Sequence, residues 1–165
     1  MLNKQDKFME LFYPLYGNLW KFILSITRNR ETAKDILSET VLIAYEKFET
    51  LKNEQAFLSY LFTIASRINS AENKKKSKID FKENFELEDF KGNYISPEDA
   101  TDINILYKLL DRLPEKQKEA IILLEIFGFS RKEIADIQNT NITNVKIRLY
   151  RGRKYLDKLI NEDNS

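Results

Sequence analysis

Residues 113–156 read LPEKQKEAIILLEIFGFSRKEIADIQNTNITNVKIRLYRGRKYL, and this stretch decides the fold. Ser130 and Glu133 have the S-x-x-E spacing of a capping box, so a helix is expected to begin directly after Ser130. The sequence QNTN then predicts a tight turn, in which Asn139 tolerates a left-handed backbone and Asn141 caps a second helix. Two short helices joined in this way predict a helix-turn-helix.

The second of these helices has an apolar stripe and a cationic outer face. Ile142, Val145, Leu149 and Gly152 recur at three- and four-residue spacing and are expected to face inward. The positions left outside are mostly polar or cationic: Asn144, Lys146, Ile147, Arg148, Arg151, Arg153 and Lys154. A short cationic helix held against another is the shape that enters a DNA major groove, although a solvated basic helix gives the same pattern.

The composition excludes several classes of function. The chain of 165 residues contains no Cys and no His, which argues against disulfides, thiol catalysis, imidazole bases and nearly all zinc sites. It has only four Gly and no glycine-rich phosphate loop. No apolar run approaches the roughly 18 residues of a membrane span, and the first residues lack the apolar segment of a signal peptide. We therefore expect a cytoplasmic protein that is not an enzyme, has no membrane span and needs no cofactor or metal.

The charges lie in three blocks, although the formal net charge is only +1. Residues 67–78 contain five basic residues and one acid, and residues 143–158 contain six basic residues and one acid. Between them, residues 79–100 contain seven acids and two basic residues. Two cationic blocks on either side of an acidic one predict two separate DNA contacts.

The acidic block also predicts a domain boundary. It contains the turn signal KGN, and the sequence SPED after it is typical of a helix start, with Ser as the cap and Pro in the first turn. We predict an all-α fold of two small helical domains joined by a flexible acidic linker. The expected bounds are 1–78 for the first domain, 79–96 for the linker and 97–163 for the second domain.

The first domain is predicted to be helical throughout. Apolar stripes predict helices at residues 4–28, 31–48 and 55–76, and Pro14 and Gly17 are expected to bend or split the first one. Three helices with such stripes can bury one common core.

Two surfaces of this domain have a pattern that fits binding. In the second helix, the positions that the core does not need are Asp35, Ser38, Glu39 and Leu42, a pattern that solvation alone also explains. In the third helix, aromatic and cationic or polar residues are interleaved: Tyr60, Phe62, Thr63, Arg67, Asn69, Lys74, Lys75 and Lys76. Aromatic rings near cations suit unpaired bases, each stacked base contributing about 1–3 kcal/mol, but core aromatics beside a basic helix end would look the same.

The order of residues resembles that of a known family. The runs LPEKQ (113–117), FSRKEIA (129–135) and NVKIRLYRGRK (144–154) resemble the fourth region of bacterial sigma-70 family RNA polymerase sigma factors, of the extracytoplasmic-function (ECF) type. The runs AKDILSET (33–40) and FLSYLFTIA (57–65) resemble the second-region helix and the promoter-melting segment of the same family.

The resemblance implies a region 2-like domain that binds core polymerase and the −10 element, and a region 4-like helix-turn-helix domain that binds the −35 element. Such a protein binds core RNA polymerase through the β′ clamp helices and the β flap, recognises promoter DNA and promotes transcription initiation. An anti-sigma factor is a further partner that the family implies. Two alternatives stay open: a stand-alone helix-turn-helix regulator, which would need a dimerisation surface, and a helical protein-interaction module.

The resemblance also assigns residues. For core-polymerase binding it implies Asp35, Ile36, Glu39 and Thr40, with Ile36 partly in the core. For DNA binding it implies Lys52, Asn53, Gln55, Tyr60, Thr63, Arg67, Lys74 and Lys75 in the first domain, and Asn144, Lys146, Arg148 and Arg151 in the second.

This sequence departs from the family pattern at two places. Tyr60 and Arg67 stand where Trp and Asn are usual, and QNTN stands where the turn usually reads Leu-Gly-apolar-Ser. Because Thr140 takes the place of an apolar methyl, we expect a looser turn, and we expect Thr140→Ile to stabilise the second domain by about 1 kcal/mol.

Overall fold

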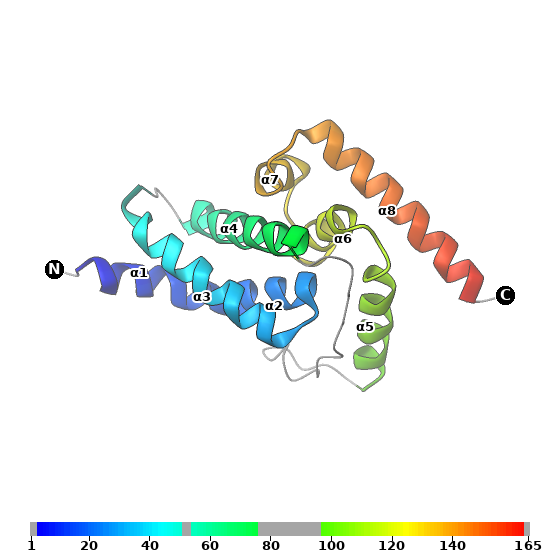
Figure 1. Cartoon of the computed structure of the whole chain (residues 1–165), viewed down its shortest axis with the longest axis horizontal. Helices are drawn as coiled ribbons and strands as arrows, with labels where there is room; N and C mark the ends of the chain where they lie inside the picture. Colours follow the sequence, from blue (N-terminus) through cyan, green and yellow to red (C-terminus); the bar gives the residue numbers. More distant parts are fainter. Residues whose placement is uncertain (1–2, 51–53, 76–96, 164–165) are drawn as a thin grey trace. The chain divides into compact units, whose positions relative to one another are not determined.

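The computed structural model describes residues 3–50, 54–75 and 97–163, which are helical and contain no strand (Figure 1). The elements are α1 (Lys4–Phe12), η1 (Tyr13–Leu15), α2 (Tyr16–Thr27), α3 (Arg30–Glu46), η2 (Phe48–Thr50), α4 (Glu54–Lys75), α5 (Pro97–Leu110), α6 (Glu115–Ile121), η4 (Ile122–Ile126), α7 (Arg131–Ile137) and α8 (Ile142–Asp163). None of these helices is apolar enough over the length that a membrane crossing needs.

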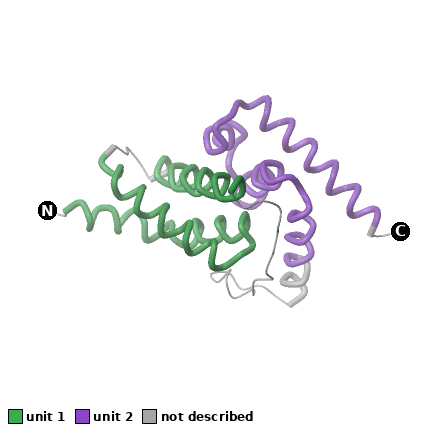
Figure 2. The backbone as a smooth tube through the Cα atoms, viewed as in Figure 1, with its two compact units in different colours: residues 1–90 green, residues 91–165 purple. Residues whose placement is uncertain are grey.

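The chain divides into two compact units, unit 1 within residues 1–90 and unit 2 within residues 91–165 (Figure 2). The prediction of an all-α fold with two small helical domains is therefore confirmed. The acidic linker and the domain bounds placed at its ends fall in or beside residues 76–96, which lie outside the described residues, so these bounds stay predictions.

The first predicted helix of unit 1 is split, as expected from Pro14. This residue lies in the short 3₁₀ turn η1, which separates α1 from α2. The chain then reverses at Arg28, whose φ of 53° is left-handed and whose N–H donates to the Leu24 carbonyl at 2.8 Å. Asn29 caps the next helix, because its Oδ1 accepts from the Thr32 N–H at 2.9 Å.

The core of unit 1 is rich in aromatic rings. Helices α2, α3 and α4 pack on one another, and Phe22 of α2 stacks on Phe62 of α4 with ring centroids 4.4 Å apart. Phe8 of α1 meets Tyr45 and Phe57 edge-on, with centroids 5.3 and 5.7 Å away. This packing fixes α3 and α4, whose outer faces carry the predicted contact residues.

Unit 2 contains the predicted helix-turn-helix. The Ser130 side chain accepts from the Glu133 N–H and the Glu133 carboxylate accepts from the Ser130 N–H, so the capping box at the start of α7 is present. Asn139 has a left-handed φ of 53°, and Asn141 caps α8 by accepting from the Asn144 N–H at 2.8 Å. The predicted helix start, turn and second cap are confirmed.

Helix α8 lies against both α6 and α7, and its inward stripe includes the buried Val145, Leu149 and Gly152. A Cβ atom on Gly152 would lie 2.7 Å from Cδ1 of Ile121, so the glycine allows α8 to approach α6 closely. Ile142 was expected inward, but it is 41% exposed, so that expectation is wrong. Helical side chains lean toward the N-terminus, and that of the first residue extends past the helix end instead of onto α6.

The segment between α6 and α7 is not a plain α-helix. Residues of η4 form a π-helical turn, in which the Phe127 N–H donates to the carbonyl of Ile122, five residues earlier, at 3.3 Å. Glu125 lies on this turn and pairs with Arg153 of α8 at 2.7 Å. The apolar spacing did not predict this π turn.

Candidate nucleic-acid interface

The outer face of α8 carries the second group of predicted DNA-contact residues. Asn144, Arg148 and Arg151 follow one another at spacings of four and three residues, so they share one face of the helix. Asn144, Lys146 and Arg151 are exposed, and Arg148 is half-buried. The structure therefore brings all four predicted residues to the surface of α8, near its N-terminal half.

Arg148 is held by a hydrogen-bond network that reaches the interior of unit 2. Its Nη1 donates to Oε1 of Gln138 at 2.8 Å. The amide nitrogen of Gln138 donates in turn to Oε1 of Glu119 at 3.0 Å and to the carbonyl of Lys116 at 3.1 Å. Gln138 is 7% exposed and Glu119 is 1% exposed, so Arg148 is tied to α6 through buried groups.

Asn144 is held by the same turn. Its Nδ2 donates to Oγ1 of Thr140 at 2.9 Å, and the Thr140 N–H donates to the carbonyl of Ala135 at 2.9 Å. Thr140 is only half-buried and its hydroxyl has a partner. Two hydrogen bonds therefore hold Thr140 in the turn, and the expectation that it merely takes the place of an apolar methyl is wrong.

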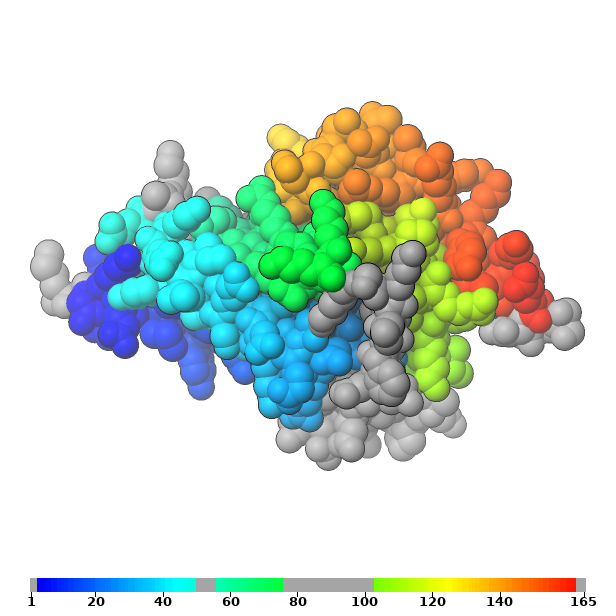
Figure 3. Space-filling view, viewed as in Figure 1, coloured from blue at the N-terminus to red at the C-terminus, as the bar shows by residue number. Residues whose placement is uncertain are grey.

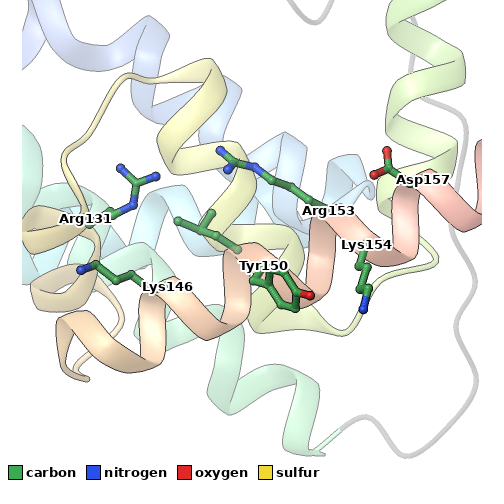
Figure 4. A pocket seen from close by; sticks show the side chains of 7 residues that line it. Arg131, Lys146, Tyr150, Arg153, Lys154 and Asp157 are labelled. Atoms are coloured by element: carbon green, nitrogen blue, oxygen red, sulfur yellow. The ribbon is translucent and has the colours of Figure 1, made fainter.

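A cationic pocket of about 530 Å³ lies beside the inward edge of α8 (Figure 4). Its lining has four cationic side chains, one acid, one leucine and one tyrosine: Arg131, Lys146, Arg153, Lys154, Asp157, Leu149 and Tyr150. The Lys154 ammonium lies 5.3 Å from the centre of the Tyr150 ring. Such a cluster suits DNA phosphate groups, which position a protein on the duplex without reading its sequence.

Arg131 was not among the predicted residues and comes to this pocket from α7, whereas Lys146 and Arg153 come from α8 (Figure 4). Its positive charge, directly after the Ser130 cap of the first helix of the motif, was the available signal.

In unit 1, α4 presents a mixed aromatic and cationic stripe. Tyr60, Thr63, Arg67 and Lys74 recur at spacings of three, four and seven residues, which places them on one face. Tyr60 and Thr63 are half-buried, and Arg67, Lys74 and the adjoining Lys75 are exposed. Burial raises the pKa of Tyr60 and the positive charge of Arg67 opposes this, so the Tyr60 phenol keeps its proton at neutral pH.

Two residues interleaved with this stripe belong to the core instead. Phe62 is fully buried against Phe22, and Asn69 is buried as well. For Phe62 the core interpretation is therefore the correct one. Among the other predicted DNA contacts, Lys52 and Asn53 lie outside the described residues, as does the side chain of Gln55.

The predicted polymerase-binding residues on α3 separate into two groups. Asp35 and Glu39 are exposed, together with Ser38 and Leu42, on the surface of residues 30–46, coloured light blue to cyan in Figure 3. Ile36 is 1% exposed and Thr40 is 0% exposed. Both therefore support α3 from inside, and only the first group is open to a partner.

Comparison with known families gives matches in both units. The model of sigma-70 region 2 matches residues 11–73, and the model of sigma-70 region 4 matches residues 103–156. Among curated proteins, the RNA polymerase sigma factor SigV of Bacillus subtilis is 31% identical over 141 residues, covering 84% of this chain and 82% of SigV. The ECF RNA polymerase sigma factor EcfG of Rhodopseudomonas palustris is 27% identical over 153 residues, covering 88% of this chain and 81% of EcfG.

Solved structures show the same fold. The sigma factor RpoE, in complex with the anti-sigma factor NepR from Bartonella quintana, has a TM-score of 0.73 and 22% identity, covering 93% of this chain and 98% of RpoE. CnrH, in complex with the cytosolic domain of CnrY, has a TM-score of 0.69 and 19% identity, covering 96% of this chain and 90% of CnrH.

Proposed function

The chain belongs to the sigma-70 family as an RNA polymerase sigma factor of the ECF type, and we propose a division of its contacts between the two units. Unit 2 reads the −35 element with the outer face of α8. Unit 1 binds core polymerase with α3 and the melted −10 element with α4. The observation that carries this proposal is the exposed cationic face of α8, where Arg148 and Asn144 are held in place by the preceding turn.

The docking of core polymerase is assigned to the acidic face of α3. Asp35 and Glu39 lie one helical turn apart and project from a helix whose other side is buried, so a pair of carboxylates faces outward. Such a pair suits a cationic partner surface, which the family resemblance places on the β′ clamp helices. The β flap is the corresponding partner for unit 2.

The capture of unpaired −10 bases is assigned to α4. Tyr60 offers a protonated phenol and an aromatic ring, and Arg67, Lys74 and Lys75 offer charge for the phosphates of a single strand. Because Tyr60 is half-buried, its ring is supported by the core and needs little ordering when a base stacks on it.

In this proposal the protein supplies no catalysis, since its contribution is binding and positioning. It acts in the cytoplasm, where core polymerase meets the chromosome. The structural relatives RpoE and CnrH were solved with NepR and with part of CnrY. On that basis we include an anti-sigma factor among the proposed partners.

The test exchanges the charges on α3. Asp35→Arg together with Glu39→Arg is expected to keep the helical circular dichroism of the wild type and to abolish co-purification with core RNA polymerase. The matched control is Asp6→Arg with Glu10→Arg, which makes the same change of charge at the same spacing on exposed positions of α1. Normal polymerase binding by the α3 variant, or equal loss in both variants, would show that this docking surface is wrong.

A further inference from the structure

The turn before α8 does more than connect two helices, because its side chains hold two of the predicted DNA-contact residues. We propose that Gln138 is a positioning residue, which presets Arg148 to read a guanine in the upstream promoter element. This inference rests on the proposed function of unit 2, and it adds the residue that fixes specificity and the base that is read.

The amide of Gln138 has one orientation that its neighbours allow. Its nitrogen faces two acceptors, Oε1 of Glu119 at 3.0 Å and the carbonyl oxygen of Lys116 at 3.1 Å. If the amide were turned over, its oxygen would face those two oxygens and its nitrogen would face the donors of Arg148. The Oε1 of Gln138 is therefore committed to the guanidinium.

The anchor behind this amide is the buried carboxyl group of Glu119. Oε1 of Glu119 also lies 3.5 Å from the ammonium of Lys116, and the side chain of Glu119 is 1% exposed. The path from Glu119 through Gln138 to Arg148 joins α6, the end of α7 and α8. Arg148 is thus braced against the interior of unit 2, and its position follows that of α6.

The braced guanidinium still has donors to offer. It carries five N–H groups, and among the described residues its hydrogen-bond partner is Gln138, through Nη1. A bidentate contact to O6 and N7 of guanine needs two donors. Arg148 is only half-buried, so its remaining donors can reach a base.

Fixing the arginine in advance lowers the entropy that it loses on binding a base. Removing the hydrogen bond from Gln138 should therefore reduce the preference for guanine at one position by about 5–30-fold. This range corresponds to the entropy cost of ordering a long side chain. The loss should not extend to other positions, because Asn144 is held by Thr140 and not by Gln138.

In the experiment, the complex of the full chain with core polymerase selects its preferred sequences from a pool of duplex DNA randomised over the upstream region. Arg148→Ala identifies the base pair that Arg148 reads, as the position whose guanine preference disappears. Gln138→Met, which removes the amide at similar length, is expected to weaken that same preference 5–30-fold while leaving the salt dependence of binding unchanged. Combining both changes should cost no more preference than Arg148→Ala alone.

Two further variants separate positioning from simple stability. Glu119→Gln keeps the shape of the anchor but replaces its carboxyl acceptor by an amide, which weakens the hold on the Gln138 nitrogen, so it should give a partial loss at the same base pair. Glu125→Gln is the matched control, since it makes the same replacement in the Glu125–Arg153 pair, 2.7 Å apart and outside the network, and should leave that preference unchanged. If Gln138→Met loses helical content, Glu119→Gln decides the question.

Several outcomes would overturn the positioning role. Full guanine preference in a folded Gln138→Met or Glu119→Gln variant would do so, and so would an equal loss of affinity for all sequences. A gain in affinity for all sequences would show that Gln138 shields Arg148. Selection of no sequence by the wild-type complex would instead refute the proposed function of unit 2, so the two failures can be told apart.

Discussion

The close approach of α8 to α6 predicts that Gly152 and Ile121 are energetically coupled. A Cβ at Gly152 would lie 2.7 Å from Cδ1 of Ile121, so Gly152→Ala forces that terminal methyl to move. The added methyl group gains about 1 kcal/mol of helix propensity. Pushing Ile121 from its rotamer costs about 0.5–1.5 kcal/mol. The net change in the free energy of unfolding is therefore expected to lie within about 0.5 kcal/mol of zero.

The coupling appears when Cδ1 is removed first. Ile121→Val alone should destabilise unit 2 by about 0.5–1.5 kcal/mol. In that background the alanine methyl enters vacated space, so Gly152→Ala should stabilise by about 1 kcal/mol. The difference between the two backgrounds, about 1 kcal/mol, is the coupling energy of the double-mutant cycle.

Native-state hydrogen exchange followed on peptides of α8 measures the opening of unit 2 separately from unit 1. Gly17→Ala, followed on peptides of α2 in unit 1, is the control, since a Cβ at Gly17 meets nothing within 4 Å and its effect should not depend on residue 121. Additivity of Gly152→Ala and Ile121→Val within about 0.3 kcal/mol would refute the inferred contact.

Three other predictions follow from the described contacts. Thr140→Ile should lower the stability of unit 2 by about 1 kcal/mol, because Asn144 loses its partner; a rise in α8 exchange protection would contradict this. Because burial raises the pKa of Tyr60, the native state holds the phenol proton to higher pH than the unfolded chain does. The contribution of Tyr60 to stability is therefore constant below the ordinary tyrosine pKa of about 10 and falls above it. Tyr60→Phe should reduce this alkaline loss of stability, measured by urea titrations followed by the fluorescence of Trp20. Lys154→Ala should weaken binding to all DNA sequences alike and flatten the salt dependence by about one counterion, whereas selective loss at one base pair would assign Lys154 to base reading.

The local features of the fold could be predicted because a few neighbouring residues determine each one. The capping box needs only Ser130 and Glu133, and the turn needs only the tolerance of Asn139 for a left-handed backbone. The split at Pro14 is equally local, because proline lacks the donor that a continuous helix requires.

The width of a buried stripe depends on how many neighbours a helix has, and periodicity alone does not give that number. Helix α4 packs against both α2 and α3, so its buried arc extends to Phe62 and Asn69. The packing around α3 likewise buries Thr40, which the family resemblance assigned to polymerase binding.

The brace on Arg148 could not be predicted because its members are far apart in the chain. Gln138 and Glu119 are separated by 19 residues, and Arg148 lies 10 residues beyond Gln138. In the sequence, Gln138 looks like any solvated polar residue of a turn, because its buried acceptors belong to α6 and become its neighbours only in the folded structure. The departure of the turn from the family pattern was visible in the sequence, but the sequence suggested a weakness where the structure has a hydrogen-bonded anchor.

The π turn of η4 has a geometrical consequence for the whole helix-turn-helix. Each residue of an α-helix rotates the chain by about 100° about the helix axis, so one surplus residue sets the azimuth at which the chain leaves α6. The direction in which the chain leaves therefore depends on the number of residues in the segment. Point substitutions leave it in place, whereas the deletion of one residue from Ile122–Ile126 would let the turn revert to α-helical spacing and redirect everything after it.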